Sequence, residues 1–415
     1  VTKLLLTAGA AAGAAPACPA EPDNTCSVPD DAASAAVEAA GANGEESASW
    51  VPAHWSEIDR VPRSDAGAIE AHIRQQRPVV IQNGSIVPTS GWEDLDTLAK
   101  TMSQTKVLVK RSRRESVAYF REERNTGGHD FRAEDFIRQS KVPFSEFIDA
   151  AEKARRADAD ADDDSVFYCQ ETFVGHPELQ QEFSNWDWTW VLQQCQRHDW
   201  GLPETNVLFM GSEGATTPAH FDEQHNFLNQ VRGHKLVVLF PPDDYTHMYP
   251  FPVTHPCDRC SMVDVQRPDL ERFPLFTKAR GHVTLLGPGD VVYIPYGWWH
   301  YCRTQTHLAA SITFWAQTSR GAEAPKTMPF KFGPMEWTRA RRNLEKLLAD
   351  DVGPTKLSEE VLRLLEVIDR GEVGDARLQA LRRMLAILQI AEEDQLRFLA
   401  DTFTGRFGFD PNEYV

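Results

Sequence analysis

The chain has 415 residues, a formal net charge of −18, 41% hydrophobic residues and 10% aromatic residues. This composition is typical of a globular protein of one or two domains, and the acidic balance argues against a nucleic-acid-binding protein, which usually carries a basic surface. No apolar run reaches the roughly 18 residues that a transmembrane helix needs, so we do not expect a membrane protein.

Seven cysteines are spread thinly along the chain, which favours a reducing compartment and therefore a cytoplasmic or nuclear protein. Cys257 and Cys260 form a CxxC motif, but no second pair accompanies it, so a zinc site is not expected. Residues 1–48 are rich in Ala, Gly, Ser, Glu and Pro, and we interpret them as a disordered tail. Their apolar beginning, KLLLTAGAAAGAAPACPA, would also suit a cleaved targeting segment.

Beyond this tail the first signals are a strand and a helix. The β-branched run RPVVIQN (77–83) predicts a buried strand, and VPFSEFIDAAEKARRA (142–157) predicts a helix that is followed by an acidic loop. From Val207 onwards, short apolar segments alternate with Gly and Pro signals, which predicts a β-sandwich or barrel. Its expected strands are NVLFMG, HNFLNQV, HKLVVLFPP, HVTLLG, DVVYIP and LAASITFWA.

After Pro334 the pattern becomes helical. Helices are expected over residues 337–350, 357–371 and 375–403. The last carries an apolar stripe with spacings of three and four, formed by Leu378, Leu381, Leu385 and Leu388. Because this stripe follows a complete β domain, we expect it to form a homodimer interface; packing on the outside of the barrel is the alternative.

These changes of pattern divide the chain into three parts. They are the tail (1–48), a main domain (49–330) whose β core occupies about 205–318, and a helical dimerisation region (331–415).

The segment TTPAHFDEQHNF (216–227) suggests a metal site. Side chains two apart on a strand point to the same face, so His220 and Asp222 would project together, and Asn226 with them if the strand is unbroken. The segment GPGDVVYIPYGWWH (287–300) offers a third ligand, because its turn begins a strand that we expect to end at His300. Two histidines and one carboxylate are the facial triad of non-haem Fe(II) oxygenases.

Lys235 adds to this interpretation. It begins the strand of GHKLVVLFPP and shares parity with Val237 and Leu239. A lysine on an apolar strand face must pair with an anion or extend its amine to solvent. A dicarboxylate co-substrate beside the metal would supply that anion; a structural Asp or Glu is the alternative.

Four long motifs resemble the asparaginyl hydroxylases of the factor-inhibiting-HIF type, which are JmjC-type members of the cupin superfamily. The motifs are TTPAHFDEQHNF, RGHKLVVLFPPDDYTHMYPFPVTHPCDR, DLERFPLF and GPGDVVYIPYGWWH, and the resemblance extends from about Trp50 to the carboxyl end. It implies a mainly β protein with α elements, built on a double-stranded β-helix (jelly-roll) core that uses Fe(II), O2 and 2-oxoglutarate. The implied partner is a protein with an ankyrin-repeat or transactivation-domain segment, and the implied assembly is a homodimer through the carboxyl-terminal helices.

The resemblance also implies roles for individual residues. His220, Asp222 and His300 match the iron ligands. The co-substrate would be held by Lys235, Thr217, Tyr168, Asn226 and Thr313. The protein substrate would contact Tyr119, Arg259 and Cys260 and, more loosely, Gln224.

Two of these positions depart from the family pattern. Thr313 stands where the family has an asparagine, and Cys260 stands where a glutamine helps to recognise the target amide. The second departure leaves open whether Asn, Asp or His is the acceptor. Two other functions also remain open: a JmjC lysine demethylase, and a non-catalytic cupin that acts as a binding or scaffold protein.

Overall fold

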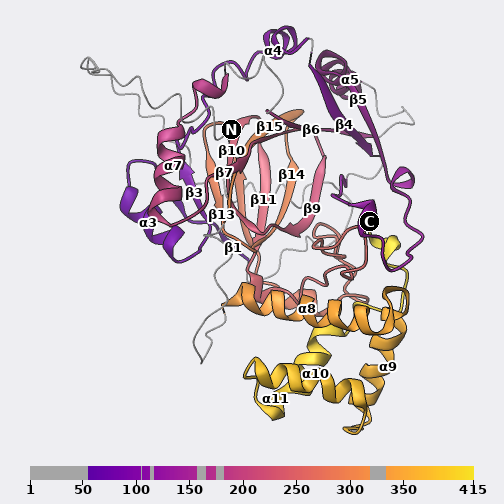
Figure 1. Ribbon diagram of the computed structural model, residues 1–415. Helices are drawn as coiled ribbons and strands as arrows, with labels where there is room; N and C mark the ends of the chain where they lie inside the picture. Colours follow the sequence, from indigo (N-terminus) through magenta and orange to yellow (C-terminus); the bar gives the residue numbers. More distant parts are fainter. Residues whose placement is uncertain (1–54, 104, 113–115, 157–164, 174–181, 318–332) are drawn as a thin grey trace.

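The computed structural model describes residues 55–415 except 104, 113–115, 157–164, 174–181 and 318–332. The tail expected over residues 1–48 and nearly all of the acidic loop lie outside the described residues. The described chain is mainly β, with two sheets in its centre and helices around them (Figure 1). This confirms the mainly β jelly-roll core with additional helices that the sequence predicted.

The smaller sheet contains five strands in the order β1-β12-β11-β14-β9. In that order, their bounds are Ser56–Glu57, His282–Leu286, Lys235–Phe240, Trp299–Thr304 and Thr216–Phe221. The larger sheet has the order β2-β3-β13-β10-β15-β8-β6-β4-β5, and β7 pairs with β15. In that order, with β7 last, the bounds are Arg60–Pro62, Val79–Gln82, Val291–Ile294, Gln224–Arg232, Leu308–Gln317, Val207–Ser212, Val166–Thr172, Lys106–Ser112, Ile137–Pro143 and Pro203–Thr205. All the strands expected from apolar runs lie in these sheets, whereas periodicity did not reveal β4, β5 and β6.

Apolar layers cover both faces of each sheet. Between the sheets, Val237 and Leu239 of β11 belong to one cluster with Leu228 of β10 and Val292 of β13. The outer face of the larger sheet is covered by helices that lie above and to the left of the barrel in Figure 1. These helices are α3 (Ala66–Arg74), α4 (Leu95–Thr101), α5 (Phe144–Arg156) and α7 (Trp188–Arg197). The outer face of the smaller sheet packs against residues 245–279.

The carboxyl-terminal helices form a layer of their own below the barrel in Figure 1. They are α8 (Pro334–Val352), α9 (Leu357–Asp369), α10 (Ala376–Ile387) and α11 (Glu392–Phe403). The stripe that we assigned to a dimer interface is largely buried inside this layer: Leu378, Leu381 and Leu385 are at most 4% exposed within one chain. The stripe therefore packs neither on the barrel nor on an exposed face, because the four carboxyl-terminal helices bury these leucines together.

The single helix expected over residues 375–403 is two helices, α10 and α11. Gln389 between them has a φ of +62°, and the amides of Gln389 and Ile390 bond the carbonyls of Ala386 and Leu385 at 3.0 Å each. This is the Schellman arrangement that ends many helices. Because the left-handed residue is Gln and not Gly or Asn, the sequence carried no clear stop signal.

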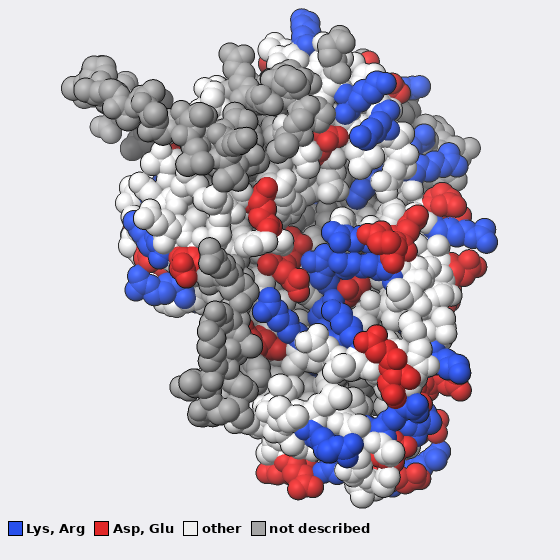
Figure 2. All heavy atoms as spheres, in the orientation of Figure 1, with Lys and Arg blue, Asp and Glu red and all other residues white. Residues whose placement is uncertain are grey.

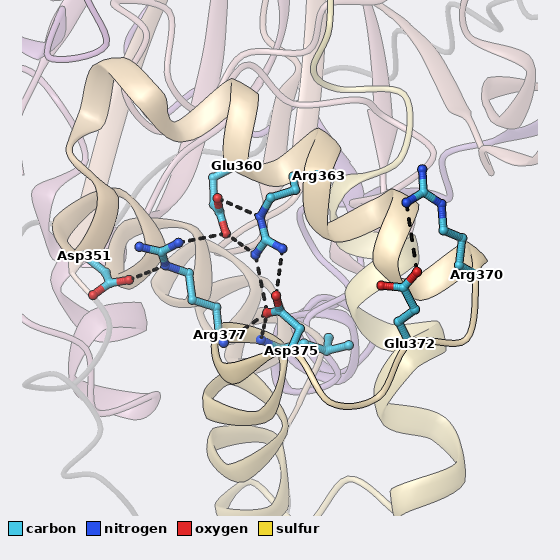
Figure 3. Close-up of polar contacts among 8 residues, drawn as sticks. Asp351, Glu360, Arg363, Arg370, Glu372, Asp375 and Arg377 are labelled. Atoms are coloured by element: carbon cyan, nitrogen blue, oxygen red, sulfur yellow. Dashed lines mark hydrogen bonds and ion pairs between the residues drawn. The ribbon is translucent and has the colours of Figure 1, made fainter.

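Charged side chains join three of these helices at their ends. Arg363 of α9 donates to Glu360 and to Asp375, the residue that caps α10 (Figure 3). Arg377 of α10 donates to Asp351 of α8 and to Glu360. None of the helices in the described parts of the chain is long and apolar enough to cross a bilayer.

Candidate active site

The three expected metal ligands come together. β9 and β14 are antiparallel neighbours, and their register places His220 opposite His300. One ligand atom from each of His220, Asp222 and His300 lies within 4.8 Å of the other two, and this is the one such cluster among the residues that the structure describes. The donor set of two imidazoles and one carboxylate is the set that suits Fe(II) in oxygenases.

Two details of the expected geometry are wrong. Asp222 is not on an unbroken strand, because β9 ends at Phe221 and the chain passes there into β10 of the other sheet. His300 does not end a strand; it is the second residue of β14, since β13 stops at Ile294 before the turn through Gly297, whose φ is +76°. The Gly297 amide donates to the Asp222 carbonyl at 3.0 Å, which ties this turn to the ligand segment.

The backbone orients both imidazoles. The Nδ1 atoms of His220 and His300 lie 2.9 Å and 3.1 Å from the carbonyl oxygens of Pro218 and Trp298. Since Nδ1 then carries the proton, Nε2 of each ring has a free lone pair for a metal. Burial lowers the pKa of His220, which favours the neutral imidazole that a metal requires.

A cavity of about 450 Å³ extends from this cluster into the barrel, a size within the range of roughly 300–1,000 Å³ for ligand pockets. Lys235 lies on its wall and is only 2% exposed. Its strand neighbours Val237 and Leu239 face the interior between the sheets, as the parity predicted. No acidic side chain among the described residues pairs with the Lys235 amine. Burial lowers the pKa of Lys235 to about 8, which is the cost of an ammonium group without a counter-charge.

Hydroxyl groups lie on the same wall. Thr217 and Tyr168 lie 3.3 Å apart through their oxygens, and burial raises the pKa of the Tyr168 phenol. Thr217 is three residues before His220, a spacing that would normally put it on the opposite face. A register shift between β9 and β14 pairs Thr217 with Cys302 and His220 with His300, so three steps along β9 match two along β14. This irregularity lets Thr217 and His220 line one cavity.

Two further buried polar atoms, one on the cavity wall and one on the strand beside Lys235, have no partner in the described structure. They are Oδ1 of Asn226 and Oγ1 of Thr304, both buried, and Thr304 is paired in register with Lys235. Gly211 allows the close approach of Tyr168 and Thr304, because a Cβ there would lie 2.9 Å from Tyr168 and 3.0 Å from Thr304. An oxygen-rich ligand that accepts and donates hydrogen bonds would satisfy these groups.

Thr313 also lines the cavity, but its hydroxyl is engaged elsewhere. It lies 3.3 Å from the amide of Val207 and 3.4 Å from the Val207 carbonyl. Those bonds occupy both the donor and one acceptor position of the hydroxyl, so Thr313 has less to offer a co-substrate than Lys235 or Tyr168.

The substrate-side residues lie around the mouth of the cavity. The segment containing Arg259 and Cys260 runs along the edge of β9, where the Phe221 amide bonds the Arg259 carbonyl at 3.2 Å. The Cys260 thiol bonds the carbonyl of Tyr119 at 3.6 Å, and burial raises the pKa of Cys260 to about 12. Gln224 also reaches the cavity and donates to Glu204 at 3.2 Å.

Sequence reasoning missed the groups that hold this segment. Asp258, next to Arg259, accepts from both terminal nitrogens of Arg342 on α8 and from Arg124. Glu345 of α8 accepts from the Val253 amide at 2.7 Å. The segment is therefore anchored to the carboxyl-terminal helices, and no local pattern relates Asp258 to a partner 84 residues away.

Sequence reasoning also missed Lys110. It lies on β4, is 5% exposed and lines the same cavity as the metal cluster. The stretch KVLVKRS carries the same signal that identified Lys235, a lysine within an apolar strand run, and could have been singled out in the same way.

Known proteins share the core of this chain. A family model described as a cupin-like domain matches residues 66–321. HSPB1-associated protein 1 of Rattus norvegicus is 39% identical over 137 residues, 32% of this chain and 29% of that protein. JmjC domain-containing protein D of Dictyostelium discoideum is 31% identical over 172 residues, 40% of this chain and 38% of that protein.

A third relative matches over a longer stretch. The tRNA wybutosine-synthesizing protein 5 of Danio rerio is 29% identical over 234 residues, 54% of this chain and 68% of that protein. The chain thus covers less than a third of HSPB1-associated protein 1, and none of these three names specifies an asparaginyl hydroxylase.

Proposed function

The chain belongs to the cupin-like domain family, and on this premise we propose that it is an Fe(II)- and 2-oxoglutarate-dependent dioxygenase that hydroxylates side chains of a partner protein. One observation carries the proposal. A cluster of His220, Asp222 and His300 shares a cavity with Lys235, a buried amine without an acidic partner among the described residues.

The residues of this cavity fit both Fe(II) and 2-oxoglutarate. The two imidazoles and the carboxylate would hold Fe(II) and leave one side of the metal open. Lys235 would bind the distal carboxylate of 2-oxoglutarate, assisted by the hydroxyls of Tyr168 and Thr217. When bound, iron and 2-oxoglutarate supply the oxidising power, with O2 as oxidant and succinate and CO2 as products. The protein positions the reactants and restricts water in a largely buried cavity.

A protein is the acceptor that we propose, with asparagine as the target implied by the family resemblance and Asp or His as alternatives. The mouth residues Tyr119, Gln224, Arg259 and Cys260 would contact a segment of ankyrin-repeat or transactivation-domain type. The name of HSPB1-associated protein 1 refers to a protein partner, which supports this class of partner. A tRNA acceptor is disfavoured by the net charge of −18, because nucleic-acid binding relies on neutralising phosphates.

The alternative functions fit the cavity less well. A methyl-lysine carries a positive charge, whereas Lys110 and Arg259 line the cavity as cations without acidic partners in the described structure. A non-catalytic scaffold would not need three metal ligands and Lys235 in one cavity.

We also propose a homodimer through the carboxyl-terminal helices, as the family resemblance implies. The leucine stripe does not support a dimer, because it is buried within one chain. Its support is now the set of exposed apolar side chains on these helices, which are Leu347 of α8, Leu362 of α9 and Ile387 of α10.

Measurement of bound metal and of succinate tests the proposed function. We expect one Fe(II) per chain and formation of succinate from 2-oxoglutarate with Fe(II) and ascorbate. Asp222→Ala should weaken metal binding and abolish succinate formation, because it removes a ligand. Glu223→Ala is the matched control, an exposed carboxylate at the next position that is not in the cluster. Full turnover and unchanged metal content in Asp222→Ala would contradict the proposal.

A further inference from the structure

Two cations on the wall of the cavity have no ion pair in the described part of the chain. Lys110 is almost fully buried on β4, and its amine has neither a hydrogen bond nor an ion pair there. Arg259 is half-buried, its Nε atom is buried without a partner, and its φ of +76° is rare for a residue with a side chain. Backbone strain and unpaired buried charges are features that persist at functional sites.

Both cations lie near Cys260, which neighbours a residue of the metal cluster. Cys260 forms an isolated β-bridge with His220, and the charges of both Arg259 and Lys110 act on its thiol. Lys110 pairs in register with Tyr168, so it lies one strand further out than the phenol that reaches Thr217. In Figure 2, Lys and Arg atoms gather near the centre of the face shown, with Asp and Glu atoms beside them, over the region where Figure 1 places β9.

Acidic side chains on the cavity wall do not neutralise these cations. Asp222 belongs to the metal cluster, Glu204 accepts from Gln224, and Asp258 accepts from arginines. Glu223 is exposed to solvent.

Among the remaining groups at the mouth, Tyr119 offers a donor, and the side-chain oxygen of Gln224 offers one acceptor. Tyr119 accepts from Nε of Arg121 at 2.7 Å, which leaves its own O–H to donate. The Cys260 thiol is already used on the Tyr119 carbonyl, and the Gln224 amide nitrogen on Glu204. A carboxylate only accepts hydrogen bonds, whereas the amide of asparagine also brings an NH2 that needs an acceptor.

We propose that Lys110 and Arg259 bind the carboxylate of an acidic acceptor side chain, so that this enzyme hydroxylates aspartate in preference to asparagine. This inference rests on the proposed function. One atom of O2 is inserted into a C–H bond of the substrate to give C–OH. The other atom enters succinate, which forms when 2-oxoglutarate loses CO2. Arg259 offers the planar fork that matches a carboxylate, and Lys110 adds a second charge-assisted bond.

Peptide pools that differ at one position test this selectivity. We would use pools with Asp, Asn or Ala at the centre and random flanks, and measure peptide-dependent succinate and the mass gain of one oxygen atom in the peptide. The wild type should prefer the Asp pool. Lys110→Met should lower the Asp-to-Asn ratio by about tenfold or more, because it removes a buried charge partner. Lys110→Arg should keep most of the preference.

Three further measurements separate recognition from other roles. Lys106→Met, an exposed lysine on the same strand, is the matched control and should leave the ratio unchanged. The KM for 2-oxoglutarate should not change in Lys110→Met, whereas a lysine that binds the co-substrate would raise it. The unfolding midpoint should be unchanged or higher, since the variant removes a buried unpaired charge.

The outcomes that overturn the inference differ from those that overturn the proposed function. A wild-type preference for Asn, an unchanged ratio in Lys110→Met, or a raised KM for 2-oxoglutarate would each reject aspartate recognition by Lys110. Succinate formation that no pool stimulates would reject a protein acceptor, and absence of both metal binding and succinate would reject the dioxygenase itself.

Discussion

At the scale of single residues, Lys235 and Lys110 carry charges that the described chain leaves unpaired inside the protein. An ammonium group that loses its hydration without a counter-charge destabilises the fold, and burial lowers the pKa of each lysine to about 8. Both amines remain largely protonated at neutral pH. Methionine would fill a similar volume without this cost, which supports our proposal that each lysine binds an anion.

We predict that 2-oxoglutarate binds Lys235 only in its charged form. The affinity should therefore be constant below pH 8 and fall about tenfold per pH unit above it, because the pKa of the free lysine is about 8. Calorimetric titration of the Mn(II) protein without O2 would measure this. Lys235→Met should bind weakly at every pH.

Lys235→Arg provides the control, since arginine keeps its charge across this range. Its affinity for 2-oxoglutarate should not fall between pH 8 and 10. If the wild type showed the same flat profile, Lys235 would not be the group that binds the distal carboxylate.

Part of the site could be predicted residue by residue. Strand parity correctly grouped Lys235 with inward-facing neighbours, because β11 is regular. Parity could not place Thr217, which shares the cavity with His220 through a register irregularity, nor show that Asp222 lies beyond the end of β9. Such departures depend on pairing with a distant strand, and a single sequence does not reveal pairing.

At the scale of elements, the carboxyl-terminal helices have two structural roles. They bury their own core, and α8 anchors the mouth of the active site through Arg342 and Asp258. Arg406, which follows α11, bonds Glu345 at 2.9 Å and the carbonyl of Pro250 at 2.8 Å, so the end of the chain supports the same segment. An apolar stripe in a sequence shows that a face is buried, but it does not show whether the partner is the same chain or a second copy.

The two sides of α10 should respond differently to a new charge. Leu385 is fully buried and Ile387 is 67% exposed. Leu385→Arg places an unpaired charge in the helical core and should destabilise this region by about 3 kcal/mol or more. It should also reduce activity, because α8 packs in the same helical core and its Arg342 would no longer hold Asp258 in place. Ile387→Arg should leave the unfolding midpoint within a few tenths of a kcal/mol but dissociate a dimer.

Chemical unfolding and sedimentation at micromolar concentration would separate these effects. Sedimentation of the wild type as a monomer would reject the dimer while leaving the stability prediction intact. A Leu385→Arg protein as stable as the wild type would contradict the packing of α10.

At the scale of the whole molecule, alternating apolar and polar segments were enough to predict a two-sheet β core. They were not used to predict its completion by β4, β5 and β6, which extend the larger sheet beside the cavity; only β5 is polar along most of its length. The contact that joins the β core to the carboxyl-terminal end of the chain could not be predicted from these patterns either. His255 lies in the segment that covers the smaller sheet and is fully buried, and its Nε2 lies 3.1 Å from Oδ1 of Asn412.

This buried histidine should couple folding to pH. The Nδ1 atom of His255 accepts from the Cys257 amide at 3.0 Å, so Nε2 carries the proton and donates to Asn412, and the ring is neutral. Burial lowers the pKa of His255 to about 4, although the hydrogen bond to Asn412 raises it, and the nearby His129 lowers it further. Unfolding exposes the ring and restores a pKa near 6.5.

Because the folded pKa is the lower one, the neutral ring's contribution to stability is complete above pH 6.5 and is lost as the pH falls from 6.5 to about 4. The slope should be about 1.4 kcal/mol per pH unit for this one histidine. We predict that His255→Gln, which keeps a donor and an acceptor but does not titrate, removes this slope. Urea unfolding of both proteins between pH 7.5 and 4.5 measures it. The difference in unfolding free energy should be constant above pH 6.5 and should shift in favour of the variant below it; a difference that stays constant over the whole range would show that His255 is not held neutral by the fold.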